Sequence, residues 1–202
     1  MVKSPQCKSK AWRLPLALAA MLVAGSSWAQ WTLDEADSGV NFVSIKNASV
    51  AETHSFGSLQ GSISASGAIE LSIDLGSVET GIEIRDQRMR EVLFEVVKFP
   101  TATVTASVSP DILDAVTAGG AVTTELPVKL ALHGMEKSLL ITVRAVGQAG
   151  GKLHVFTPQP VLVNASDFNL AAGIVALQEI AGLSSISTAV PVTVNLVFDS
   201  AR

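Results

Sequence analysis

The densest set of side chains that could do chemistry lies between residues 85 and 90. Arg85, Asp86, Arg88 and Arg90 bring three guanidinium groups and one carboxylate together. Guanidinium groups bind carboxylates and phosphates well, so the cluster could meet the polar headgroup of a ligand. It could also order the helix as a lid. On an exposed helix the same residues would only form ion pairs worth about 0.2–0.5 kcal/mol each. Both interpretations stay open, with Arg85, Asp86 and Arg90 as candidate ligand-binding residues.

Other groups that could catalyse a reaction or bind a metal are sparse. None of the three histidines, His54, His133 and His154, lies two or four residues from another. Glu52 and His54 would share one face of a strand, which keeps a metal or acid–base pair open. No Gly-x-Ser-x-Gly, phosphate-binding or metal-binding motif occurs. We therefore expect a protein that is not an enzyme and that has no catalytic residue, no metal and no resident cofactor.

The N-terminal segment has the form of a secretory signal peptide. Four basic residues precede an apolar run over 14–24, and Ser27-Trp28-Ala29 follows with small residues at both ends. The run is well short of the roughly 20 residues that span a bilayer. We expect cleavage near Ala29, a periplasmic location, and a single domain over residues 30–202 that does not span the membrane.

Removal of residues 1–29 would leave an acidic chain without cysteine. Four of the 14 Lys and Arg residues and none of the 18 Asp and Glu residues lie in this segment, so the formal net charge becomes −8. An acidic surface repels nucleic acid and anionic headgroups, and no nucleic-acid partner is expected. Because Cys7 is also removed, the fold must be stable without disulfide bonds. A monomer and a homodimer are both compatible with the sequence.

The elements that must position these groups are strands. Apolar residues alternate with polar ones over 69–75, 126–132, 139–146 and 190–198, and more weakly over 40–45, 56–64, 102–108 and 153–163. No regular alternation of strands with long helices occurs. The pattern predicts an all-β protein with about eight antiparallel strands. A sandwich and a closed barrel both satisfy it, and we favour the barrel because closure removes exposed strand edges.

Two segments break the two-residue period. Thr80 and Glu83 have the spacing of a capping box, and apolar residues recur at helical spacing from Met89 to Val96. This predicts a short helix over about 80–97 that ends before Pro100. Residues 168–187 have a helix-compatible centre between two glycines and predict a helical or irregular crossover.

A series of short motifs follows one another through the chain in a fixed order. They are Ile73-Asp74, Ser77-Val78-Glu79-Thr80-Gly81, Arg85-Asp86-Gln87-Arg88-Met89-Arg90, Leu93-Phe94 and Lys98-Phe99-Pro100, supported by Asp37-Ser38-Gly39-Val40-Asn41-Phe42, His54-Ser55-Phe56-Gly57 and Leu130-Ala131-Leu132-His133-Gly134. In this order the series resembles the YceI-like family of polyisoprenoid-binding, lipocalin-like proteins, over nearly all of residues 31–198. The resemblance implies an exported, eight-stranded lipocalin-like β-barrel whose lumen holds a long apolar lipid such as a polyisoprenoid or an isoprenoid quinone. It also implies a closing, structural role for the Arg85 cluster.

Composition supports an open lumen independently. An eight-stranded barrel is just wide enough to be filled by side chains or to hold one slender ligand, and small residues such as Ala102, Val104 and Ala106 would leave space if they point inward. We therefore expect a binding or carrier protein, with an envelope stress or interaction protein that uses the barrel as a scaffold as the alternative. The candidate ligand-binding aromatic residues are Phe42, Phe56, Phe94, Phe99 and Phe156.

Overall fold

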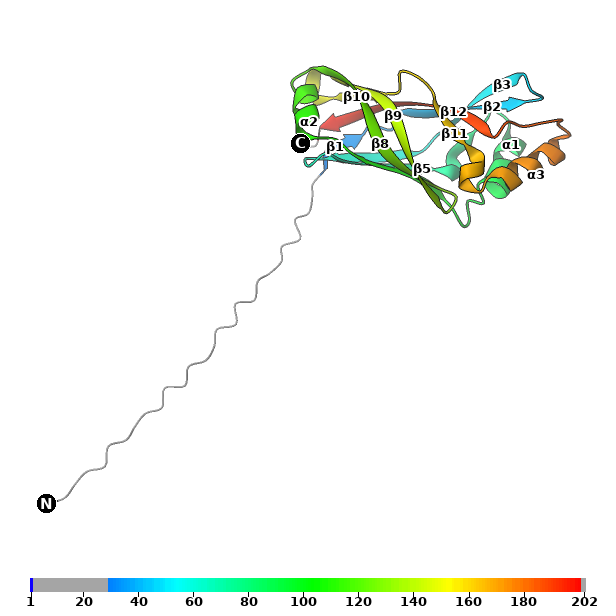
Figure 1. The fold of residues 1–202 in the computed structure, drawn as a ribbon, viewed down its shortest axis with the longest axis horizontal. Helices are drawn as coiled ribbons and strands as arrows, with labels where there is room; N and C mark the ends of the chain where they lie inside the picture. The colour runs from blue at the N-terminus through cyan, green and yellow to red at the C-terminus, as the bar shows by residue number, and fades with distance from the viewer. Residues whose placement is uncertain (2–28, 201–202) are drawn as a thin grey trace.

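The chain closes into an antiparallel β-barrel with helices at both ends (Figure 1). The computed structural model describes residue 1 and residues 29–200. Apart from its two end residues, the predicted signal peptide therefore lies outside the described residues. The strands are β1 (Ala29–Leu33), β2 (Gly39–Lys46), β3 (Val50–Phe56), β4 (Leu59–Ser64), β5 (Ala68–Asp74), β6 (Val78–Glu79), β7 (Thr101–Ser107), β8 (Ala121–Leu132), β9 (Met135–Gly147), β10 (Leu153–Phe156), β11 (Val161–Asn164) and β12 (Ala189–Ser200).

The barrel closes because β12 pairs with both β10 and β1, and β1 in turn pairs with β4. Three of the barrel strands consist of two segments each. β1 and β2 follow one another along one edge of β12, β4 and β3 pair with them, and β10 and β11 follow one another along the other edge of β12. Together with β5, β7, β8, β9 and β12 they form eight antiparallel strands, and the short β6 pairs with β3. The predicted eight-stranded barrel is confirmed.

The interruption between β1 and β2 is bridged by a side chain. Ser38 lies in the break, where its Oγ accepts a hydrogen bond from the Val197 amide at 2.9 Å. Lys152 also contacts this region, with its Nζ 3.1 Å from Asp34 Oδ2 and 3.5 Å from Asp37 Oδ2 and Asp199 Oδ1. These contacts hold the two segments against β12 where the backbone ladder is broken.

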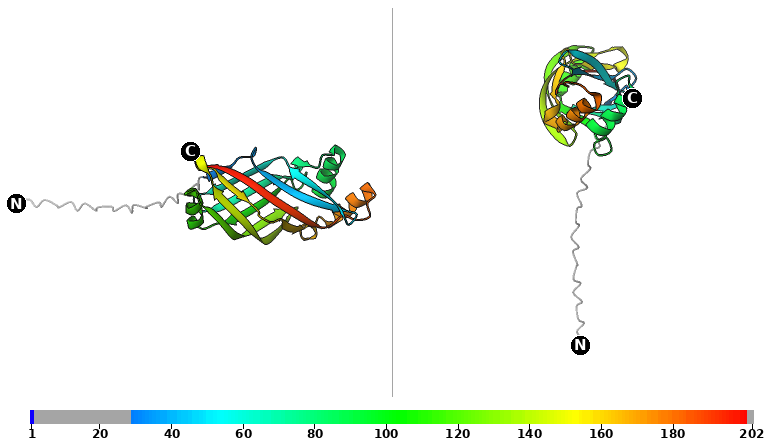
Figure 2. Two further views of the ribbon diagram at one scale, coloured as in Figure 1. Left: turned by 90° about the horizontal axis from the view of Figure 1, so that it is seen from above. Right: turned by 90° about the vertical axis from the view of Figure 1, so that its right-hand side faces the viewer.

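Three helices and four short helical turns connect the strands. They are α1 (Glu83–Arg88), α2 (Pro110–Thr117) and α3 (Ala171–Ala181), the 3₁₀ turns η1 (Leu75–Ser77), η3 (Ala149–Gly151) and η4 (Ala165–Phe168), and the π-helical turn η2 (Met89–Leu93). Viewed from the end that carries α1 and α3, the strands form a ring and the two helices lie across part of it (Figure 2).

The helix expected over about 80–97 is present but shorter, because regular helix gives way to the π turn after Arg88. The predicted capping box is wrong. Ile82 is the N-cap residue, and the amide and hydroxyl of Thr80 instead donate hydrogen bonds to the Asp86 carboxylate. The chain turns away well before Pro100, since Glu95 has a left-handed φ of 46°. The crossover expected over about 168–187 is confirmed as helical in its centre, where α3 lies.

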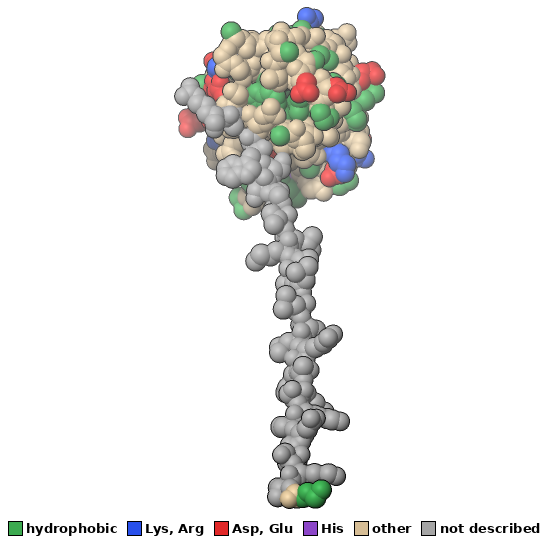
Figure 3. Space-filling model, turned by 90° about the vertical axis from the view of Figure 1, so that its left-hand side faces the viewer, with side chains coloured by type: hydrophobic (Ala, Val, Ile, Leu, Met, Phe, Trp, Pro, Cys, Tyr) green, Lys and Arg blue, Asp and Glu red, His purple; other side chains and the backbone are tan. Residues whose placement is uncertain are grey.

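Helix α2 was not expected from the two-residue pattern. It closes the end of the barrel opposite to α1 and α3, with Leu113 and Val116 buried against the lumen end. The packing is close enough that a Cβ on Gly147 of β9 would lie 1.8 Å from the Val116 carbonyl oxygen. From this end the surface not covered by grey atoms is continuous, with scattered apolar, acidic and basic side chains (Figure 3).

Candidate functional site: an apolar lumen

The inward faces of the strands enclose a cavity of about 260 Å³. Protein interiors contain few voids larger than one water molecule, and about 10–15 Å³ is enough to hold a water, so this space is far larger than a packing defect. All of its lining residues except Thr157 are apolar. A site of this composition can retain an apolar molecule and offers almost no groups for hydrogen bonding or proton transfer.

The cavity is not filled by side chains because one wall carries small ones. On β7, Ala102, Val104 and Ala106 all line it, as their spacing predicted. They pair in register with Ile73, Leu71 and Ile69 of β5, which line the same cavity. Since partners in register share one face of a sheet, aliphatic side chains meet small ones across this wall and leave space between them.

Four of the five candidate phenylalanines line the cavity. Phe42, Phe56 and Phe94 form a row at the α1 end, with ring centroids 5.3 Å and 5.9 Å apart. Phe156 lines it where β10 ends. Phe99 is not among the lining residues and packs instead on His133, at 4.4 Å between ring centroids.

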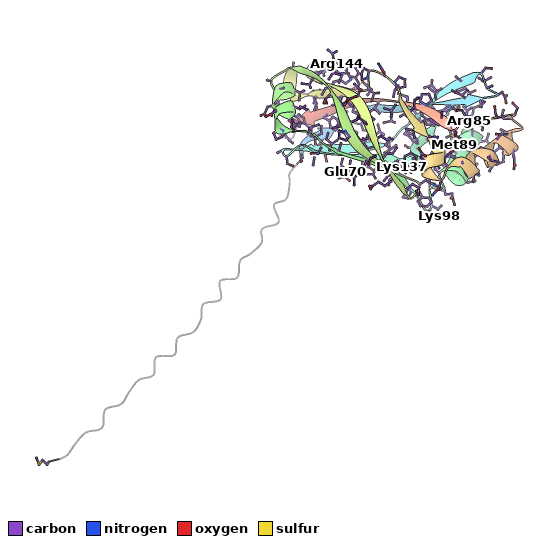
Figure 4. All side chains as sticks on the ribbon, in the orientation of Figure 1. Glu70, Arg85, Met89, Lys98, Lys137 and Arg144 are labelled. Carbon is purple, nitrogen blue, oxygen red and sulfur yellow. The ribbon has the colours of Figure 1, made fainter. Side chains whose placement is uncertain are left out.

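The charged candidates lie in α1 and the π turn, outside the cavity lining, and Figure 4 labels Arg85. Arg85 Nη1 lies 2.5 Å from Glu52 Oε2 of β3, and Arg85 Nη2 donates to the Thr80 carbonyl oxygen at 2.5 Å. Asp86 accepts from the Thr80 amide at 2.9 Å. Arg85 therefore fastens α1 to β3, and Asp86 binds the turn that precedes α1. Arg90 lies in the π turn and also stays outside the lining.

Beside this contact lies a buried histidine. The Lys46 ammonium, 2.7 Å from Glu52 Oε2, lowers the pKa of Glu52 against the opposing effect of burial, and Arg85 adds to the lowering. His54 Nε2 lies 2.8 Å from Ser44 Oγ, and burial together with the Arg85 charge lowers the pKa of His54. The Glu52–His54 pair that the sequence left open is not formed, because Glu52 binds Lys46 and Arg85 whereas His54 binds the Ser44 hydroxyl.

The remaining histidines have separate partners. His133 Nε2 lies 3.1 Å from Glu95 Oε2, and His154 Nε2 lies 2.5 Å from Asn195 Oδ1. No histidine lines the cavity. Among the described residues there is no group of three or more His, Cys, Asp or Glu that could hold a metal ion, and no described helix is long and apolar enough to cross a membrane.

Sequence reasoning missed the residues that close the α1 end of the lumen. Leu170 and Ile174 of the crossover line the cavity beside Leu93 and Phe94. Gly173 lets α3 approach the π turn, because a Cβ there would lie 2.9 Å from the Val92 carbonyl oxygen. The four-residue spacing of Leu170 and Ile174 was the available signal, but it does not reveal which element a helix packs against.

Comparison with known proteins places this barrel among others of the same design. A family model of the YceI-like domain matches residues 31–198, and no match is found among curated proteins. The structure of a polyisoprenoid binding domain from Saccharophagus degradans, implicated in plant cell wall breakdown, is 36% identical with a TM-score of 0.83, covering 86% of this chain and 100% of that one.

Two more distant structures support the fold alone. BcnA of Burkholderia cenocepacia is 23% identical with a TM-score of 0.62, covering 82% of this chain and 98% of that one. The YCEI protein of Campylobacter jejuni is 16% identical with a TM-score of 0.50, covering 74% of this chain and 84% of that one. Because the family model spans nearly all of the barrel, the chain belongs to the YceI-like domain family.

Proposed function

We propose that the protein is a periplasmic carrier or sequestering protein that holds one long apolar molecule in its lumen, such as a polyisoprenoid or an isoprenoid quinone. The observation that carries this proposal is the cavity of about 260 Å³, whose lining is apolar except for Thr157. The polyisoprenoid binding domain that is 36% identical supports the same class of ligand. No catalytic step is part of the proposal.

Burial alone supplies enough free energy for retention. Each buried CH₂ group contributes about 0.8 kcal/mol, so ten enclosed carbons contribute about 8 kcal/mol, which corresponds to a dissociation constant near 1 μM before ordering costs. A few prenyl units would therefore be held without any polar contact. A lumen filled by side chains would have favoured the alternative, an envelope protein that uses the barrel as a scaffold. The cavity does not provide that support.

The test is extraction of the purified protein with organic solvent, followed by mass spectrometry. We expect a molecule with a long apolar chain at about one per protein chain. Two variants of β7 provide the matched comparison: Val104→Trp, which places a large ring in the lumen, and Thr103→Trp on the alternate, outward face of the same strand. The Thr103 variant should retain the molecule and the Val104 variant should lose it. Equal extracts from both, or no apolar molecule above a mock purification, would contradict the proposal.

A further inference from the structure

The barrel wall has an interruption on one side of β9. β10 pairs with β9 only from Gly147 to Arg144, and β11 pairs with β12 alone. Within residues 29–200, the stretch of β9 from Met135 to Val143 therefore has a backbone partner on its β8 side only. We call the gap between this stretch and β11 the β9–β11 slot; both strands are labelled in Figure 1.

The sequence explains why the ladder stops here. Pro158 and Pro160 separate β10 from β11, and proline has no N–H to donate to a neighbouring strand. Thr157 stays bound to β12 instead: its amide donates to the Val194 carbonyl oxygen and its Oγ1 accepts from the Val194 amide, both at 3.0 Å. The chain thus follows β12 and leaves the edge of β9 unpaired.

The lumen reaches the slot from inside. Leu139, Ile141 and Val143 of β9 line the cavity on one side of the slot, and Val161 and Val163 of β11 line it on the other. One outward residue on each edge is also apolar and exposed: Leu140 is 65% exposed and Leu162 is 70% exposed. Apolar side chains therefore run from the cavity to the surface along both edges.

At both ends of the barrel, helices pack closely on neighbouring backbone. At one end, α2 lies so close to Gly147 that even a methyl group would collide with its carbonyl oxygen. At the other end, Gly173 of α3 packs directly on Leu93 of the π turn, with its ideal Cβ 3.0 Å from Leu93 Cα. Leaving through either end requires a helix to move, and leaving through a paired wall requires backbone hydrogen bonds to break. At the slot, no ladder hydrogen bond between the described strands β9 and β11 has to break.

We propose that a long apolar chain passes into and out of the lumen sideways, through the β9–β11 slot. The route rests on the proposed function, since it has a purpose only if the lumen holds a ligand. The cavity between the two edges and the exposed apolar residues on both fit the hydrocarbon part of a lipid.

Bridging the slot tests the route. In a Cys7→Ser background, Leu140→Cys and Leu162→Cys are joined by a short bis-maleimide that ties the two edges together. Both side chains are exposed, so the fold should tolerate their replacement. The matched bridge joins Glu125→Cys to Thr142→Cys, which are partners in register on the fully paired β8 edge of the same strand.

A third variant locks the α1–α3 end. Asn47 Oδ1 accepts from the Ser184 hydroxyl at 2.9 Å, so Asn47→Cys and Ser184→Cys are placed to form a disulfide between the β2–β3 hairpin and the segment after α3. Binding and release of N-phenyl-1-naphthylamine, which fluoresces in apolar surroundings, are followed at equilibrium and by stopped flow, with geranylgeraniol as the displacing ligand.

We expect the slot bridge to slow release of the dye by about tenfold or more, and the β8–β9 bridge and the end lock to leave the rate unchanged. The route would be overturned if the bridged slot released the dye at the unmodified rate. It would also be overturned if the end lock slowed release and the slot bridge did not. Either result would leave the proposed function standing. Absence of dye binding by the unmodified chain, with no displacement by geranylgeraniol, would overturn the proposed function and the route with it.

Discussion

Replacing Ala106 of β7 with phenylalanine should fill part of the lumen and displace an equal part of any bound chain. Ala106 lines the cavity between its register partners Ile69 of β5 and Val128 of β8. The added six-carbon ring is about as large as one five-carbon prenyl unit. At about 0.8 kcal/mol per buried CH₂, losing one unit removes about 4 kcal/mol of binding free energy, or roughly a thousandfold in Kd. The value is an upper limit, because a chain can shift along the lumen.

Thr105→Phe is the matched control, since Thr105 lies between two lumen residues and is exposed on the outer face of the same strand. The delipidated variants are titrated with geranylgeraniol by calorimetry. We expect Kd to rise by about a hundredfold to a thousandfold for Ala106→Phe and to stay close to the unmodified value for Thr105→Phe. Thermal unfolding tests whether the ring is accommodated, because overpacking of a filled core would cost about 1–3 kcal/mol. A folded Ala106→Phe protein with unchanged Kd would refute the lumen as the binding site.

Four further outcomes follow from contacts and closure. Because burial and the Arg85 charge lower the pKa of His54 in the folded state, the unfolded state takes up the proton first as pH falls below about 6.5. Tm should therefore drop there and His54→Gln should flatten the profile; parallel profiles would contradict this. Arg85→Ala should cost about 0.5–1 kcal/mol in urea unfolding by freeing α1, whereas Arg90→Ala should cost less; equal losses would deny Arg85 its fastening role. Gly147→Ala should lower the free energy of unfolding by about 1–3 kcal/mol, because its Cβ meets the backbone of α2. Gly39→Ala, whose Cβ would have its nearest atom at 3.9 Å, should change it little. Thermal unfolding of both variants measures the difference, and equal Tm values would contradict the prediction. Affinity for prenyl alcohols should rise with chain length and then level off, because helices lie at both ends of the lumen; a titration series in which it keeps rising would show that the chain is not enclosed.

The two-residue period predicted most of the strands whose side chains line the lumen. In a barrel strand every second side chain points inward, so the small residues of β7 predicted free space in the lumen if they point inward, and the structure places them on the lumen face. Phe42, Phe56 and Phe156 lie on strands and line the cavity, while Phe94 lines it from the end of the π turn. Phe99 lies in the loop before β7, where no period applies, and its position was set by the ring of His133.

What the pattern could not show is which edge of a strand is paired. The sequence predicted one strand over residues 153–163, because the alternation continues on both sides of an interruption. Pro158 and Pro160 were the visible signal for a break, but only the register shows that β11 resumes on β12 alone. Helix α2 was missed for a related reason. Its start, with Ser109 before Pro110, is typical of a helix N-terminus, but it is too short to stand out beside long strands.

Retention by burial alone limits what such a lumen can distinguish. The free energy scales with the number of enclosed carbons, and Thr157 is the only lining residue that could recognise a particular polar group. The cavity should therefore select ligands by the length and width of the apolar chain, and treat an alcohol and a quinone with the same tail alike. Any preference between headgroups must come from side chains outside the cavity, where Glu52 is paired with Lys46 and Arg85 and the buried Arg85 Nε has no hydrogen-bond partner among the described residues. A protein built this way is suited to collecting a class of apolar molecules and not one compound.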